Sequence, residues 1–294
     1  MGQKDMTEKL LEDHNDVFAD IINVLLFNGK EKVLPDSLKD TKVKSQYKAE
    51  CDKLHEIERD VAKIWKNSNI QILFGVENQT AVDVFMPFRG ISYDGASYRH
   101  QLVKNESGDI MPVITLVLYF GTKKRWNAPL NIKGLMDIPE ELEPFVSDYK
   151  INVFEIAWLS DEQVKMFKSD FRIVADYFVQ MRKNQHYVPE EKTVKHVDEV
   201  LKLMHALTGD KRYEVVFSEK EKERGVSMCD VLTKIDENAR AEGRAEGRAE
   251  ERKDCALKSI KMLRKCGQSD AFIVEQLREE YGYSLEDCEE LMKS

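Results

Sequence analysis

The sequence predicts an α/β protein in which helices cover the faces of a β-sheet. Along the first part of the chain the apolar residues follow helical spacing, then form two strand-like runs, a second helix, two more strand-like runs and a last helix. Alternation of this kind is typical of a sheet with helices packed on its faces. After Pro189 only helical patterns follow, so we expect a helical C-terminal extension.

The first helix is predicted where apolar residues recur three and four positions apart, at Val17, Phe18, Ile21, Ile22, Leu25 and Leu26. Asn15 or Asp16 is expected to cap its start, because both side chains accept hydrogen bonds from the first N–H groups of a helix. Asn28-Gly29 is a typical helix end. Residues 30–50 are polar and charged, and we interpret them as a connector.

A β-hairpin is predicted next, because residues 54–84 carry short apolar runs broken by Asn67-Ser68-Asn69. Residues 70–76 are rich in β-branched side chains and alternate at first, which favours a strand over a helix. Since the turn centres on Ser68, paired residues have numbers that sum to about 136 or 137. This register therefore predicts which residues of the two strands lie side by side at the open end of the hairpin, away from the turn.

Residues 82–103 return to helical spacing, although Gly90 and Gly95 lie inside this stretch. A glycine in a helix costs about 1 kcal/mol relative to alanine, so we expect close packing or a ligand beside these two residues. Two buried strands and a following helix are predicted from the next apolar patterns, at 112–121, 151–159 and 161–183.

The C-terminal part is predicted to be helical, with amphipathic helices at 191–208 and 219–237. Residues 240–252 repeat Arg-Ala-Glu-Gly or a close variant every four positions. Because four exceeds the 3.6 residues of a helical turn, the alanine row drifts by about 40° per repeat and cannot keep one face toward a core. We interpret the repeat as a solvated helical spacer; a basic arm on nucleic acid and an oligomerisation helix are the alternatives. In the tail, Ser284 and Asp287 have the spacing of a capping box.

Composition and charge exclude several classes of protein. The 294 residues include 45 Lys and Arg against 54 Asp and Glu, a net charge of −9, which argues against a protein coated in nucleic acid. The charge is uneven, because residues 239–266 carry nine basic and five acidic side chains and residues 267–294 carry two and eight. No stretch approaches the ~18 apolar residues of a membrane helix. Residues 1–10 lack the apolar core of a signal peptide, so we expect a cytoplasmic protein with no membrane partner.

Several kinds of site are not expected from the motifs. The five cysteines contain no Cys-x-x-Cys pair, and the six histidines show no His-x-x-x-His or Cys/His spacing that would predict a metal–histidine site. No glycine-rich phosphate loop is found, so no nucleotide cofactor is expected. No nucleophile elbow supports catalysis by serine, histidine and aspartate.

The open end of the hairpin is the best candidate site. Its pairing places Asp60 opposite Val76 or Glu77, and the two-residue period of a strand puts Gln79 on the same face as Glu77. Two close carboxylates repel unless a cation neutralises them, and hard divalent ions such as Mg²⁺ bind carboxylate oxygens and water. Such an ion can activate water and stabilise charge on a phosphodiester. An ordinary acidic hairpin end without an ion is the alternative.

A wider set of motifs occurs in a consistent order, at residues 16–23, 59–60, 75–83, 86–89, 93–94 and 118–121 and at Trp126. Together they resemble the Rpn family of recombination-promoting nucleases and putative transposases, a branch of the PD-(D/E)XK nucleases. The resemblance covers residues 10–185 and extends loosely beyond them. It implies a restriction-endonuclease-like core, with a mixed central sheet and helices on both faces.

Four segments are expected on this basis: a nuclease-like domain, a helical extension, the repeat spacer and a small helical tail, at 1–188, 189–238, 239–254 and 255–294. The resemblance assigns Asp60 and Glu77 to metal binding and catalysis. Gln79 stands where the superfamily has lysine, and Arg59 stands in place of the proline before the aspartate. An acidic residue of the first helix is expected to support the metal, and spacing does not choose between Asp16 and Asp20.

Two residues after the hairpin complete the predicted site. Arg89 and Tyr93 lie one helical turn apart. Arg89 is expected either to clamp a phosphate or to pair with a surface carboxylate, and Tyr93 is expected to support the phosphate or the structure of the site.

The resemblance implies a DNA endonuclease that uses Mg²⁺, or Mn²⁺ or Ca²⁺, to hydrolyse phosphodiester bonds and that promotes recombination. Glutamine can orient water but cannot neutralise a developing oxyanion as lysine can. The alternative is therefore a catalytically degenerate nuclease fold that acts as a DNA-binding or protein-interaction module. In either case the helical C-terminal region is a candidate for homo-oligomerisation.

Overall fold

The computed structural model of the chain describes residues 11–41, 45–48, 54–57, 60–68, 70–104 and 109–293. Residues 1–10 and Arg59, both used in the sequence analysis, lie outside the described residues. The chain divides into two compact units, Met1–Cys229 and Asp230–Ser294.

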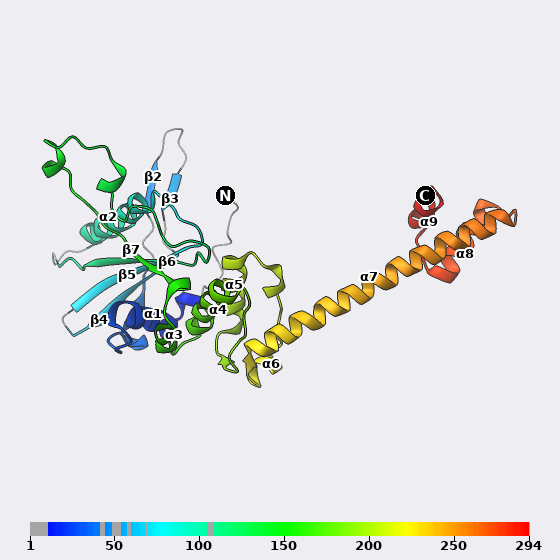
Figure 1. Cartoon of the computed structure of the whole chain (residues 1–294), viewed down its shortest axis with the longest axis horizontal. Helices are drawn as coiled ribbons and strands as arrows, with labels where there is room; N and C mark the ends of the chain where they lie inside the picture. The colour runs from blue at the N-terminus through cyan, green and yellow to red at the C-terminus, as the bar shows by residue number, and fades with distance from the viewer. Residues whose placement is uncertain are drawn as a thin grey trace. The chain divides into compact units, whose positions relative to one another are not determined.

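A five-stranded mixed sheet with the order β1-β4-β5-β6-β7 lies at the centre of the first unit (Figure 1). Neighbouring strands among β1, β4 and β5 are antiparallel, whereas β5, β6 and β7 run parallel. The strands are β1 (Leu38–Asp40), β4 (Val61–Asn67), β5 (Ile70–Gln79), β6 (Val113–Tyr119) and β7 (Asn152–Glu155). The predicted α/β class with a mixed central sheet is confirmed.

Two smaller antiparallel pairs accompany this sheet, formed by β2 (Ser45–Lys48) with β3 (Leu54–Ile57) and by β8 (Thr193–Val194) with β9 (Val226–Ser227). The interpretation of residues 30–50 as a connector was wrong, because β1 and β2 lie within them. Leu38 pairs with Trp65 and is buried, so tertiary packing makes a strand of a segment whose composition is polar.

Helices cover both faces of the central sheet, with α2 on one side and α1 and α4 on the other (Figure 1). The α2 side is closed by a cluster of buried residues, Met86, Tyr93, Val117 and Ile151. The helices of the first unit are α1 (Asn15–Phe27), α2 (Met86–Lys104), α3 (Asp161–Met166), α4 (Phe171–Asn184), α5 (Val197–Thr208) and α6 (Glu219–Glu223). Because helices bury both faces of the sheet, nearly every side chain of β6 is apolar, as is typical of a strand covered on both sides.

The two ends of α1 show one correct and one wrong prediction. Asn28 has φ 52° and Gly29 has φ 78°, so both adopt the left-handed conformation expected at a helix end. Neither Asn15 nor Asp16 caps the start, because both lie inside the helix and His14 is the residue that precedes it, with no side-chain capping bond.

The predicted helix 161–183 is broken between α3 and α4, where tertiary hydrogen bonds replace helical ones. The backbone N–H groups of Lys168 and Ser169 donate to the Asp20 carboxylate of α1, at 2.8 and 2.7 Å. The predicted helix 191–208 is present from Val197 to Thr208, with β8 before it, whereas the predicted helix 219–237 is interrupted by β9, which pairs with β8.

The second unit contains most of α7 (Met228–Lys265) together with α8 (Asp270–Tyr281) and α9 (Leu285–Lys293). The repeat lies inside α7 with exposed side chains, and a small core gathers Ala256, Ile260, Ile273, Leu277, Cys288 and Leu291. The predicted capping box is confirmed, because Asp287 N–H donates to Ser284 Oγ and Ser284 N–H donates to the Asp287 carboxylate, both at 3.1 Å. Among the described residues, no helix is long and apolar enough to cross a membrane.

The two glycines of α2 give a matched test of its packing. A Cβ at Gly90 would lie 2.9 Å from Cγ2 of Ile151, a buried side chain, whereas a Cβ at Gly95 would meet nothing within 4 Å. We expect Gly90→Ala to lower the free energy of unfolding by about 1–3 kcal/mol through overpacking, and Gly95→Ala to raise it by about 1 kcal/mol through helix propensity. Urea denaturation of the two variants measures both effects, and equal shifts in one direction would contradict this packing of α2.

Candidate functional site

The hairpin of β4 and β5 brings Asp60 beside Glu77. Val61 pairs with Val76, a register sum of 137, so Asp60 and Glu77 follow at the next paired position. The carboxylate of Asp60 accepts a hydrogen bond of 2.8 Å from the backbone N–H of Asn78. The predicted approach of these two acidic residues at the open end of the hairpin is therefore observed.

The Glu77 carboxyl group is buried, with 4 % of the residue exposed, and its two oxygens have different surroundings. Oε1 accepts hydrogen bonds from Gln79 and from the Tyr93 hydroxyl, each at 3.3 Å, and pairs with the Arg89 guanidinium. Oε2 is buried and has no hydrogen-bond partner among the residues that the structure describes. A buried carboxylate oxygen without a donor is costly, so this atom is suited to binding a cation.

The Arg89 guanidinium lies between two carboxylates. Besides Glu77, it donates to Asp83 at 2.9 Å and to the Tyr93 hydroxyl at 3.0 Å. The predicted pairing of Arg89 with a carboxylate is present, and one of its two partners, Glu77, belongs to the site itself. The side chain remains 40 % exposed, so it also reaches the surface of the site. Arg89 thus brings a positive charge to Glu77 in a site where Gln79 carries none.

Glu12 is a buried carboxyl group that the sequence analysis missed, and it interacts electrostatically with Asp60. It lies in the short 3₁₀ helix Leu11–Asp13, is fully buried and accepts a hydrogen bond of 3.0 Å from the Asn78 side chain. Its Oε2, like that of Glu77, is buried and has no hydrogen-bond partner within the described part of the chain. Asp13 fixes the position of the neighbouring Glu12, because it forms an ion pair of 3.5 Å with the buried Lys63 of β4. Nothing in the local sequence distinguishes Glu12 from the other acidic residues before α1.

Asn78 lies next to all three carboxyl groups. Its backbone N–H binds Asp60 and its side-chain amide binds Glu12, while Glu77 precedes it in β5. Because side chains alternate along a strand, the Asn78 side chain and Glu12 lie on the opposite face of the sheet from Glu77, which contacts Arg89 and Tyr93 of α2. Asp60, beside the end of β5, interacts electrostatically with both Glu12 and Glu77.

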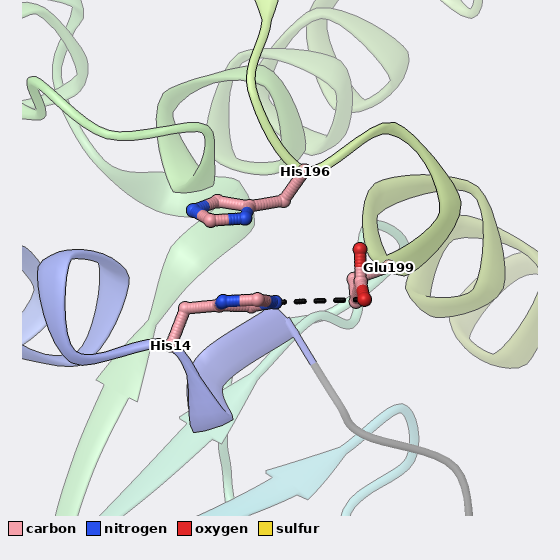
Figure 2. Close-up of side chains that lie close together, drawn as sticks. All are labelled: His14, His196 and Glu199. Carbon is pink, nitrogen blue, oxygen red and sulfur yellow. Dashed lines mark ion pairs between the residues drawn. The ribbon is translucent and has the colours of Figure 1, made fainter. Parts of the chain in front are cut away.

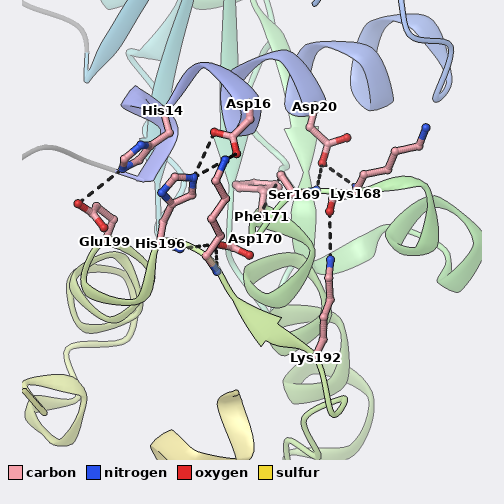
Figure 3. A network of polar contacts seen from close by, with 11 residues as sticks. His14, Asp16, Asp20, Lys168, Ser169, Asp170, Phe171, Lys192, His196 and Glu199 are labelled. Carbon is pink, nitrogen blue, oxygen red and sulfur yellow. Dashed lines mark hydrogen bonds and ion pairs between the residues drawn. The ribbon is translucent and has the colours of Figure 1, made fainter. Parts of the chain in front are cut away.

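Asp16 and Asp20, the two residues expected to support the metal, make their described contacts elsewhere. Asp16 accepts from Lys195 at 2.7 Å and from His196, which stacks on His14 (Figure 2), at 3.1 Å. Asp20 binds the backbone between α3 and α4 (Figure 3). Burial opposes ionisation of Asp16, but the hydrogen bonds from Lys195 and His196 lower its pKa to about 2. The acidic residue that the structure brings toward Asp60 is therefore Glu12.

The electrostatics of the site favour a cation. Burial, with a further contribution from the charge of Asp60, raises the pKa of Glu12 to about 7. Burial and then Asp60 likewise raise the pKa of Glu77 to about 7, although Arg89 acts in the opposite direction. Carboxyl groups that resist ionisation alone become ionised when a divalent cation binds between them. Asp60 and Glu77 are the residues that could hold such an ion.

The raised pKa of Glu12 makes the stability of the metal-free protein dependent on pH. A carboxyl group whose pKa rises from 4.5 to about 7 on folding contributes stability that is present below pH 4.5 and lost as the pH rises through 7. We expect Glu12→Gln to be more stable than the wild type at pH 8 by on the order of 2–3 kcal/mol, and to differ little at pH 4.5. Urea unfolding in the presence of a chelator measures this difference. Glu140→Gln, at an exposed position, is the control, and the same pH dependence in wild type and Glu12→Gln would contradict the prediction.

Comparison with known proteins identifies the family. No curated protein and no solved structure matches the chain significantly. Residues 1–212, which contain the whole central sheet and the site, match the family model described as putative transposase, YhgA-like. This is more than half of the chain, and the protein therefore belongs to the family of YhgA-like putative transposases, which corresponds to the Rpn recombination-promoting nucleases.

Proposed function

We propose that the protein is a metal-dependent DNA endonuclease that hydrolyses phosphodiester bonds and promotes recombination. The observation that carries the proposal is the approach of Asp60 to the buried Glu77, whose Oε2 has no hydrogen-bond donor among the described residues. Membership of a transposase family supports DNA as the substrate.

Asp60 and Glu77 would hold the ion, with Mg²⁺ as the expected species because both ligands are carboxylate oxygens. A bound Mg²⁺ supplies a water molecule of lowered pKa and positive charge for the phosphodiester. Glu77 binds with Oε2, because Oε1 is occupied by the hydrogen bonds of Gln79 and Tyr93 and by the guanidinium of Arg89.

Gln79 and Arg89 together supply the hydrogen bond and the positive charge that a single lysine supplies in other members of the superfamily. The Gln79 amide donates to Glu77 Oε1, and its carbonyl oxygen can accept a hydrogen bond from the attacking water. Arg89 provides the positive charge that Gln79 lacks, and its exposed part can bind a phosphate oxygen. Charge compensation therefore comes from α2, twelve residues after Glu77 in the sequence.

A degenerate fold is the second candidate, and one observation favours it. Arg89 already neutralises Glu77 through an ion pair, as a protein cation can where a metal has been lost. Such a protein would bind DNA or another protein through this domain without cutting DNA.

Plasmid cleavage tests the proposed function directly. With Mg²⁺, Mn²⁺ or Ca²⁺ we expect the wild type to nick or cut plasmid DNA, and we expect Glu77→Gln and Asp60→Asn to lower the rate by roughly 100-fold or more. Glu140→Gln should cut like the wild type. Cleavage by Glu77→Gln at the wild-type rate, or no cleavage by the wild type with any of the three ions, would contradict the proposal. DNA binding that persists in a protein without cleavage or metal binding would favour the degenerate fold.

The role of Arg89 is testable by changing its charge. Arg89 lowers the pKa of Glu77, so Arg89→Gln should shift the pH–rate profile of cleavage to higher pH and reduce the rate by roughly 10–100-fold. Arg89→Lys keeps the charge and should shift the profile less. A rate loss in Arg89→Gln with an unchanged profile would indicate that Arg89 supports the structure without adjusting the charge of Glu77.

A further inference from the structure

Two histidines from distant parts of the chain lie against each other where α1 and α5 begin. The ring centroids of His14 and His196 are 3.7 Å apart with an interplanar angle of 27°. Glu199, in the first turn of α5, places Oε1 3.6 Å from Nε2 of His14. Figure 2 shows a nitrogen of each imidazole on the side of the Glu199 carboxylate, and one ligand atom from each of the three residues lies within 4.8 Å of the others.

The environment of His196 resembles that of a metal ligand. Its Nε2 is 3.1 Å from Oδ2 and 3.2 Å from Oδ1 of Asp16, an ionised carboxylate, so Nε2 carries the proton and Nδ1 is the nitrogen with a lone pair. Metal-binding histidines commonly donate their other N–H to a carboxylate, which fixes the tautomer and the ring orientation. Lys195 in turn donates to Asp16 at 2.7 Å.

The backbone around His196 is also held in place. The backbone N–H groups of Lys195 and His196 both donate to Oδ2 of Asp170, at 2.9 and 2.7 Å, and Asp170 is buried (Figure 3). The residue before Lys195, Val194, pairs with β9. On the other side, His14 lies directly at the start of α1. The backbone that positions His14 and His196 is therefore held in place by regular structure and hydrogen bonds, as a metal site requires.

The distances and atom types favour one class of ion. Tetrahedral Zn²⁺ with bonds of about 2.0–2.1 Å separates its ligand atoms by roughly 3.3 Å, close to the 3.6 Å between His14 and Glu199. Imidazole nitrogens select zinc and related transition metals, whereas a site of carboxylate oxygens alone suits Mg²⁺. Two stacked imidazoles between acidic groups are also better compensated by one divalent ion than by two protons that repel each other.

We propose that His14, His196 and Glu199 form a second metal site, of the Zn²⁺ class, in which Asp16 orients His196. The site joins the start of α1 to the start of α5, and His14 is two residues from Glu12 of the carboxylate cluster. Bound metal would hold the segment that carries Glu12 against the helical region after residue 189. The sequence gives no spacing signal for this site, because its ligands come from opposite ends of the first unit.

Isothermal titration calorimetry tests the proposal. The metal-free full chain is titrated with Zn²⁺ in the presence of excess Mg²⁺, which occupies the carboxylate site. We expect a saturable equivalent of Zn²⁺ that His14→Gln, His196→Gln and Glu199→Gln each weaken by at least about 10-fold, and that Asp16→Asn weakens by roughly 10–100-fold. At about 100-fold excess over Kd, Zn²⁺ should raise the Tm of the wild type by roughly 5–10 °C. Co²⁺ should give the visible absorption of a tetrahedral site with a mixed nitrogen and oxygen donor set.

Two matched variants separate this site from other causes. His205→Gln removes another histidine of α5 that also lies near a carboxylate, Glu214 at 3.5 Å, and should leave Zn²⁺ binding unchanged. Glu77→Gln alters the carboxylate cluster and should also leave it unchanged. Circular dichroism establishes that each variant is folded, and if one histidine variant unfolds, Glu199→Gln and Asp16→Asn still test the site. Wild-type Zn²⁺ affinity in the folded variants, or no saturable binding by the folded wild type, would overturn the proposal.

Discussion

Burial of carboxyl groups at the end of β5 is the constraint on which the candidate site depends. Glu12 and Glu77 are both almost inaccessible, and each has one oxygen with a donor and one without. A buried carboxylate is stable only when it is protonated, paired or bound to a cation. The fold meets part of this need through Asn78, which binds Glu12, and Arg89, which pairs with Glu77.

The N-terminal segment has a larger role than its length suggests. Its acidic residues contact three different parts of the first unit. Asp13 pairs with the buried Lys63 of β4, and Asp16 accepts a hydrogen bond from a residue before α5. Asp20 accepts hydrogen bonds from the turn between α3 and α4. These contacts set the position of Glu12 from several directions. They also explain why the predicted long helix after β7 is broken, since its N–H groups bind Asp20 instead of the preceding turn.

The two candidate metal sites differ in chemistry although this segment reaches both. The cluster around Glu77 offers carboxylate oxygens, which suit a hard ion and hydrolysis of a phosphodiester. The cluster around His196 offers imidazole nitrogens that are oriented by Asp16, which suits a structural transition metal. Metal bound at one site would therefore affect the other through the residues between Glu12 and Asp16.

The sequence by itself determined the β4–β5 hairpin, the helix and two strands that follow it, and the approach of Asp60 to Glu77, because strand period and turn position are local properties that set the hairpin register. Only the tertiary structure decided that β1 extends this sheet, that Glu12 lies near Asp60 and that Arg89 pairs with Glu77. It also decided that His14 stacks on His196. Glu12 meets Asn78 across 66 residues and Asp16 meets His196 across 180, and contacts at such separations are set by packing of the whole domain. No local periodicity encodes them, so the candidate carboxylate of the first helix was placed at Asp16 or Asp20 and the histidine cluster was not expected.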